Sequence, residues 1–112
     1  MAEPRWRPFA ETSALPAFPG VTRRTLVSGD NLTFVRIEFE AGATVPEHTH
    51  PHEQAGTVVS GRIALRIGGE QQEVDAGGAY LIPGGLPHLV TASEPAVLFE
   101  VFAPVRKDFA ND

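Results

Sequence analysis

Histidines at alternate positions give this sequence its strongest chemical signal. Three of the four histidines lie in the stretch HTHPHEQ, where a glutamate and a glutamine follow them directly. Residues two apart on a β-strand point to the same face of a sheet, so His48 and His50 are expected to project into one space. Pro51 lacks a backbone donor and favours a bend or the end of a strand, which leaves the direction of His52 open.

Such a cluster points to a metal site. Imidazole is the commonest metal ligand in proteins, and two imidazoles from one strand form a chelate. With oxygen donors beside them, the site suits a divalent ion of borderline softness: Zn, Ni, Fe, Mn or Co. The alternative is a polar loop whose histidines are exposed by chance. The fourth histidine, His88 in IPGGLPHLV, reads alone as a turn residue and gains weight only beside the first cluster.

Length, composition and charge exclude several classes of protein. The 112 residues, 42% of them hydrophobic, suit one domain with one core. The chain has no cysteine, which excludes disulfides, thiolate ligands and a cysteine nucleophile and fits a cytoplasmic location. The nine basic residues are scattered and the net charge is -5, so nucleic acid is not an expected partner. We read no signal peptide at the start and no apolar run near the roughly 18 residues of a membrane span.

Short strands must position the histidines, because the chain from residue 21 onward shows a β pattern. The segment LTFVRIEFEAG places Val35, Ile37 and Phe39 on one face, the period-two pattern of a half-buried strand. The letters SGD before it indicate a hairpin turn, which makes VTRRTLVS the partner strand. Further strands are expected in GTVVSG, RIALRIGGE, QQEVDAGG, AYLIPGG, LPHLVTAS and AVLFEVFAP. Many short strands with close turns predict an all-β sandwich or barrel.

The first 20 residues have a different character from the rest. They are rich in Pro and polar groups, so we expect an extended N-terminal arm over 1–20 and one folded domain over 21–112. Trp6 and Phe9 are large apolar residues of this arm and would pin it to a surface.

Two motifs resemble those of the cupin superfamily. The first cupin motif is Gly, five residues, His-x-His, three or four residues, Glu, six residues and Gly; residues 42–61 match it except that a glutamine replaces the glutamate. The second is Gly, five residues, Pro-x-Gly, two residues, His, three residues and Asn; residues 77–92 match it except for Ala92 at the end. This resemblance implies a single-domain jelly-roll barrel, the double-stranded β-helix, with a metal at its mouth. By position, the implied metal ligands are His48, His50, Gln54 and His88.

The glutamine at position 54 carries a consequence for the implied metal. It leaves one less negative charge on the ion than glutamate would, which makes the ion more electrophilic. His52 and Glu53 are expected to lie outside the ligand set.

A narrower resemblance is to the pectin-degradation protein family, the KdgF type of small cupin. It rests on the segments DNLTFVRIEFEAGATVPEHTHPHEQ and LFEVFAPVRKDF. It implies conversion of 4,5-unsaturated monouronates, released by lyases from pectin or alginate, into linear 4-deoxy-5-keto sugar acids. By position, the implied catalytic residues are Glu100, where the family usually has aspartate, Phe102 and Arg106. Arg106 would grip the substrate carboxylate, Glu100 would move a proton, and Phe102 would exclude water.

Plainer roles stay open for these residues. In these alternatives, Glu100 faces solvent, Phe102 is part of the core, and Arg106 forms an ion pair with an acidic residue on the surface. Tyr80 is expected to pack in the barrel rather than donate a proton.

Other functions also stay open on the same barrel. They are an iron-dependent dioxygenase, a different sugar-acid isomerase, and a non-catalytic cupin that binds a sugar acid. A divalent metal is the cofactor we expect, and a small sugar acid is the expected ligand. Because small cupins often pair through edge strands, we expect a homodimer in which the arm covers a sheet edge of the partner.

Overall fold

The computed structural model describes residues 3–112, which form two antiparallel β-sheets. One helical turn, the 3-10 helix η1 (Phe9–Glu11), precedes the strands in this described part. The strands are β1 (Leu15–Phe18), β2 (Val21–Ser28), β3 (Thr33–Phe39), β4 (Thr44–His48), β5 (Glu53–Ser60), β6 (Arg62–Ile67), β7 (Glu70–Asp75), β8 (Ala79–Ile82), β9 (His88–Thr91) and β10 (Ala96–Ala103).

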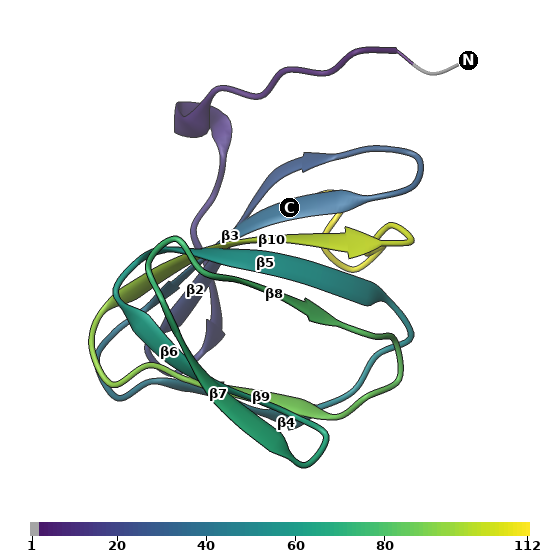
Figure 1. The fold of residues 1–112 in the computed structure, drawn as a ribbon. Coiled ribbons are helices and arrows are strands. Elements are labelled where there is room, and N and C mark those ends of the chain that lie inside the picture. Colours follow the sequence, from purple (N-terminus) through teal and green to yellow (C-terminus); the bar gives the residue numbers. More distant parts are fainter. Residues whose placement is uncertain (1–2) are drawn as a thin grey trace.

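The two sheets form the facing layers of a jelly-roll barrel (Figure 1). One sheet has six strands in the order β1-β2-β3-β10-β5-β8, and the other has four in the order β4-β9-β6-β7. From β3 onward the chain passes repeatedly between the sheets, so residues distant in sequence become neighbours across the barrel. The all-β cupin-type barrel expected from the motifs is therefore confirmed.

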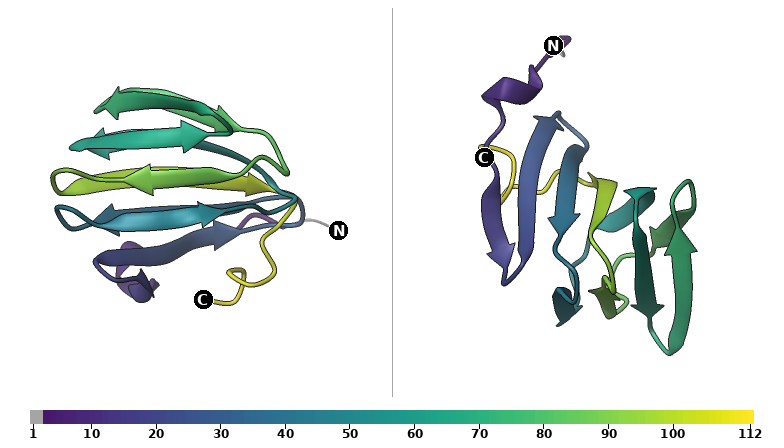
Figure 2. Two further views of the ribbon diagram at one scale, coloured as in Figure 1. Left: turned by 90° about the horizontal axis from the view of Figure 1, so that it is seen from below. Right: turned by 90° about the vertical axis from the view of Figure 1, so that its left-hand side faces the viewer.

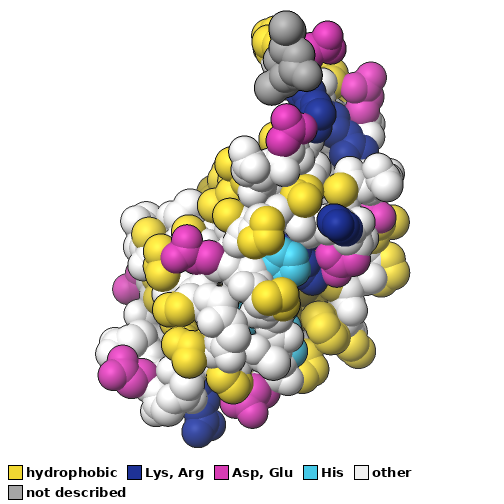
Figure 3. All heavy atoms as spheres, turned by 90° about the vertical axis from the view of Figure 1, so that its right-hand side faces the viewer, with side chains coloured by type: hydrophobic (Ala, Val, Ile, Leu, Met, Phe, Trp, Pro, Cys, Tyr) yellow, Lys and Arg dark blue, Asp and Glu magenta, His cyan; other side chains and the backbone are white. Residues whose placement is uncertain are grey.

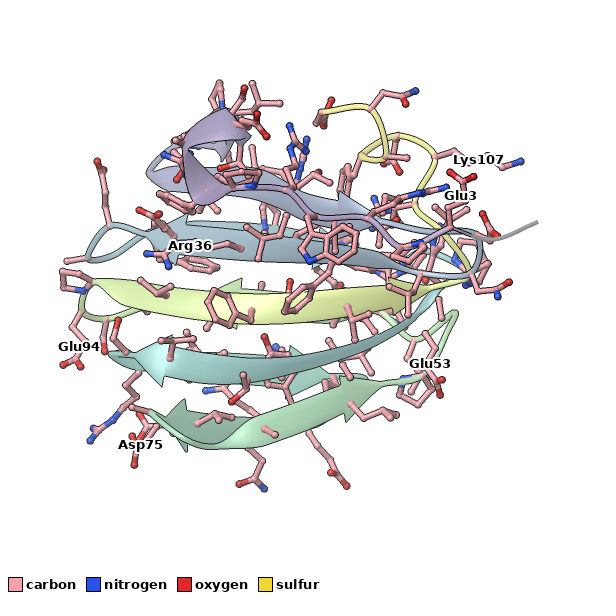
Figure 4. All side chains as sticks on the ribbon, turned by 90° about the horizontal axis from the view of Figure 1, so that it is seen from above. Glu3, Arg36, Glu53, Asp75, Glu94 and Lys107 are labelled. Carbon is pink, nitrogen blue, oxygen red and sulfur yellow. The ribbon has the colours of Figure 1, made fainter. Side chains whose placement is uncertain are left out.

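Alternation along the strands decides which side chains line the interior. In β3 every second residue is buried, as the period-two pattern predicts, and β10 shows the same alternation. Ile37 of β3 stands opposite Leu98 of β10, and Leu98 stands opposite Val58 of β5, so one apolar row crosses the sheet. Figure 4 shows the outward face of this sheet, where Arg36 lies.

Turns fall where glycine and polar residues marked them. The β2–β3 hairpin contains the SGD letters, and β2 spans the residues VTRRTLVS. Gly61 joins β5 to β6 with a φ of 79°, in the left-handed region that glycine tolerates. A Cβ added there would overlap the carbonyl oxygen of Pro95, so both conformation and space require glycine at this hairpin.

The N-terminal arm is only partly an extended tail. Residues 15–18 form β1, an edge strand paired with β2, which the reading of residues 1–20 as an arm outside the sheet missed. Phe9 does pin the arm, because the guanidinium of Arg24 lies 4.5 Å from its ring centroid. Trp6 is 85% exposed and projects from the arm. No helix among the described residues reaches the length and hydropathy needed to cross a membrane.

Candidate metal centre and ligand cavity

Three histidines converge at one end of the barrel. His48 ends β4, His88 begins the neighbouring strand β9, and the two stand opposite each other in the register of that pair. His50 follows β4 in a loop, so the expectation that both histidines lie on one strand was wrong for His50. The loop nevertheless returns His50 to the cluster, and one ligand atom from each of the three lies within 4.8 Å of the others.

Backbone carbonyls orient two of the imidazoles. The Nδ1 of His48 lies 2.9 Å from the oxygen of Pro46, and the Nδ1 of His88 lies 2.9 Å from the oxygen of Leu86. When Nδ1 donates to these carbonyls, Nε2 carries the lone pair, the arrangement usual for metal-binding histidines. The Nε2 of His88 is buried and has no hydrogen-bond partner among residues 3–112. A buried polar atom without a partner is costly, so its position fits a site completed by a metal ion.

Gln54 supplies an oxygen to the same cluster. Its Oε1 lies 3.0 Å from Nε2 of His50, while its Nε2 donates to Oε2 of Glu100 at 2.7 Å. Of the two ends of the Gln54 amide, only the nitrogen can donate to a carboxylate, so this hydrogen bond turns the amide oxygen toward the histidines. Gln54 is 5% exposed at the start of β5, so this orientation is enforced by burial as well. The four side chains expected to bind a metal thus lie together, and their donor set fits a borderline divalent ion.

The surroundings of two of these imidazoles, those of His50 and His88, favour their neutral forms. Burial, followed by the positive charge of Arg106, lowers the pKa of His50 to about 4. Burial also lowers the pKa of His88. Neutral imidazoles keep their lone pairs available, which a metal ligand requires.

Glu100 is a buried carboxyl group behind the histidines. It stands on the inward face of β10 and is 6% exposed, so the alternative of a solvent-facing Glu100 does not hold. Burial raises its pKa, while the hydrogen bonds from Tyr80 and Gln54 act in the opposite direction, as does the charge of Arg106. A carboxyl group with a raised pKa beside a metal-ligand cluster is suited to proton transfer near neutral pH.

Tyr80 has a polar role that the sequence did not reveal. Tyr80 lies on β8, and its hydroxyl donates a hydrogen bond of 2.7 Å to Oε2 of Glu100. Burial raises the pKa of Tyr80. Gly56 makes this contact possible: it stands opposite both Tyr80 and Glu100, and a Cβ on it would lie 2.5 Å from the ring of Tyr80. A glycine inside strand β5 was the available signal, because glycine in a strand often marks a close approach.

Phe102 and Arg106 line the cavity beside the histidines. Phe102 is 4% exposed and belongs to the core, and its ring also lies edge-on to His50 at 5.6 Å between centroids. The guanidinium of Arg106 lies 4.8 Å from the centroid of Phe102 and makes a two-point ion pair with Asp108, at 3.0 and 2.8 Å. Each residue therefore lines the cavity and also has its plainer contact, Phe102 in the core and Arg106 in an ion pair.

A cavity of about 250 Å³ connects these groups. Its polar lining comes from His48, His88, Gln54, Glu100, Arg106 and Arg23, and its remaining wall is apolar. In Figure 3 a histidine is visible on this face, next to basic, acidic and apolar side chains. This volume lies just below the about 300–1,000 Å³ of pockets for drug-sized ligands, so it suits a ligand smaller than those.

The two polar neighbours of the metal motif lie outside the cluster. His52 is not among the three grouped histidines, although its ring lies 5.4 Å from that of His50. Glu53 is exposed at the start of β5, at the same end of the barrel as Lys107 (Figure 4). That neither residue belongs to the ligand set stays a prediction.

Comparisons with known proteins support the same picture. Residues 35–102 match the Cupin domain family. The pectin degradation protein KdgF of Dickeya dadantii (strain 3937) is 33% identical over 92 residues, covering 80% of this chain and 84% of that protein. The structure of KdgF from Halomonas sp. has a TM-score of 0.88 at 28% identity, covering 95% of this chain and 98% of that one. An RmlC-like cupin from Shewanella frigidimarina NCIMB 400 has a TM-score of 0.89 at 26% identity, covering 96% and 97%. With both histidine motifs meeting at the mouth of a jelly-roll barrel, the chain belongs to the cupin family and resembles its KdgF members along most of its length.

Proposed function

We propose that this cupin opens the ring of 4,5-unsaturated monouronates and converts them to linear 4-deoxy-5-keto uronates. The observation that carries the proposal is the buried carboxyl group of Glu100, hydrogen-bonded to the candidate metal ligand Gln54 and facing the same cavity as Arg106. The similarity to KdgF of Dickeya dadantii, a pectin degradation protein, supports this choice of substrate class.

The reaction needs a shift of one proton and no oxidant. The bond between C1 and the ring oxygen breaks, the C1 hydroxyl loses its proton as it becomes an aldehyde, and the ring oxygen becomes the oxygen of an enol at C5. Addition of a proton at C4 and loss of the enol proton then give the 5-keto group. Substrate and product are isomers, so one carboxyl group that accepts and returns a proton is sufficient.

Each residue of the proposed site has a separate part in this reaction. His48, His50, Gln54 and His88 would hold a divalent ion, which when bound supplies a positive charge that stabilises developing negative charge on a substrate oxygen. Glu100 carries the proton, with its Oε2 fixed by two donors at 2.7 Å. Arg106 binds the uronate carboxylate as a charged donor, and Phe102 keeps water from the reacting carbons.

Proton delivery at C4 gives a sharp test. In D2O, NMR of the product formed by metal-loaded protein should show deuterium on one face of C4, because Glu100 delivers from one side of a fixed substrate. Glu100→Gln should lose this stereoselectivity and fall by about 100- to 10,000-fold in rate, the usual contribution of a positioned acid or base. Glu53→Gln is the matched control, because Glu53 is exposed.

The outcomes separate the proposal from its competitors. Deuterium on both faces at the uncatalysed rate would contradict it, and a tight complex with no turnover would make the protein a sugar-acid-binding cupin. Uptake of dioxygen by iron-loaded protein would instead point to an oxygenase.

A further inference from the structure

Arg23 is a charged residue on the inward face of the six-stranded sheet. On β2 it stands opposite Ile37, which is buried, and Ile37 stands opposite Leu98. Residues directly opposite in antiparallel strands share a face, so Arg23 occupies the apolar row that crosses the barrel. A charged group is rarely placed on a buried face unless it is paired or has a function there.

The pairing of Arg23 is incomplete. Its Nη2 donates to Oδ2 of Asp112 at 2.6 Å, and its guanidinium lies 3.7 Å from the centroid of Phe109. Its side chain is 16% exposed, and its Nε is buried without a hydrogen-bond partner in the part of the chain that the structure describes. An unpartnered guanidinium nitrogen is costly, and Arg23 lines the cavity, where a ligand carboxylate would supply its guanidinium with a second acceptor.

The C-terminal segment brings acids to this end of the cavity. The segment 106–112 turns back beside β2 (Figure 2), and the carbonyl of Phe109 accepts a hydrogen bond from Thr25 at 2.9 Å. Phe109 contacts both arginines, with the Arg106 guanidinium 4.0 Å from its centroid. Arg106 already engages Asp108 through Nε and Nη2, whereas Arg23 engages Asp112 through Nη2 alone. Arg23 is therefore the less saturated of the two arginines in the cavity.

We propose that Arg23 is a second carboxylate-binding residue of the cavity and sets its preference for acidic over neutral sugars. The Asp112 carboxylate pairs with the Arg23 guanidinium when no ligand is bound, and the carboxylate of a sugar acid displaces it. The inference deepens the proposed function, because it concerns the same cavity and substrate class, but it makes a claim about binding that does not need turnover.

Binding of a non-reacting acid and its neutral counterpart tests the inference. Calorimetry on metal-loaded protein would compare galacturonate, which lacks the 4,5 double bond, with galactose. Arg23→Met should weaken galacturonate binding about 10- to 100-fold, the loss expected for one charged hydrogen bond, and leave galactose binding unchanged. Arg24→Met is the matched control: Arg24 is the next residue of β2, and it hydrogen-bonds Thr12 in the arm. Its loss should change neither affinity.

Asp112→Asn separates ligand binding from a merely structural role. If Asp112 competes with the ligand, removing its charge should tighten galacturonate binding severalfold. If Arg23 only fastens the C-terminal segment, Asp112→Asn should weaken binding, and Arg23→Met should weaken both sugars alike; either result would overturn the inference. So would a wild-type protein with no preference for galacturonate. Galacturonate binding that depends on Arg23, in a protein that fails to turn over unsaturated uronates, would keep the inference and reject the proposed reaction.

Discussion

Removing the hydroxyl of Tyr80 should destabilise the protein in a pH-dependent way. Tyr80→Phe deletes one oxygen, which donates to Oε2 of the buried Glu100 at 2.7 Å, and leaves the ring in place. A hydrogen bond to a charged group contributes about 1.5–3 kcal/mol, and a bond to a neutral group about 0.5–1.5 kcal/mol. The cost should therefore depend on whether Glu100 is ionised.

The sign of the pH dependence follows from burial. Burial raises the pKa of Glu100 in the folded protein above its ordinary value of 4.5, so Glu100 contributes stability below pH 4.5 that is lost as pH rises through the folded pKa. The Tyr80 hydroxyl stabilises the ionised form and reduces that loss. Without the hydroxyl, the pKa of Glu100 rises further and the penalty of the variant grows with pH.

Urea unfolding of metal-free protein between about pH 5 and pH 9 measures this effect. The variant should be less stable than wild type by about 0.5–1.5 kcal/mol at the acidic end and by about 1.5–3 kcal/mol at the alkaline end. Thr57→Val is the matched control, because it removes a hydroxyl that donates to the carbonyl of Gly78 at 2.9 Å, away from Glu100. Its cost should not change with pH. A Tyr80→Phe penalty that is equally flat would refute the reasoning.

Three further outcomes are expected. Gly56→Ala should lower stability by about 1–3 kcal/mol in thermal or urea unfolding, because its Cβ would lie 2.5 Å from the ring of Tyr80; a neutral effect would contradict the close packing. His88→Ala should abolish binding of Zn or Ni in calorimetry while His52→Ala retains it, because only His88 belongs to the cluster; equal losses would place His52 among the ligands. Light scattering at micromolar concentration should give the mass of a homodimer, since β1 is an edge strand and Trp6 of the arm is 85% exposed; a monomer mass would remove that proposal.

The strands and the histidine cluster could be predicted from local patterns in the sequence. The alternation around Val35 and Ile37 predicted β3, because alternating apolar and polar residues are by themselves the signal of a half-buried strand. The cluster could be predicted from the spacing of His48 and His50 and from the second motif around His88. The resemblance to cupins was needed because it linked the distant His88 to the first motif. The reason for His50 was nevertheless different: a loop rather than the strand periodicity directs it inward.

Contacts between side chains of different strands could not be predicted from the sequence. The partnership of Tyr80 with Glu100 depends on the space left by Gly56 on the strand between them, and strand order is not written in any local pattern. Arg23 sits in a segment, VTRRTLVS, where two adjacent arginines look alike. Only the register of β2 against β3 shows that one faces the cavity and the other the arm.

The most direct test of the central claim is the rate at which the alkene absorbance of an unsaturated monouronate disappears. Wild-type protein loaded with a divalent metal should accelerate that loss well above the spontaneous rate. Metal-stripped protein, His50→Ala and Glu100→Gln should each return it close to the spontaneous rate. Acceleration that survives removal of the metal or of Glu100, or no acceleration by the loaded protein, would contradict the assignment of this cavity to uronate ketonisation.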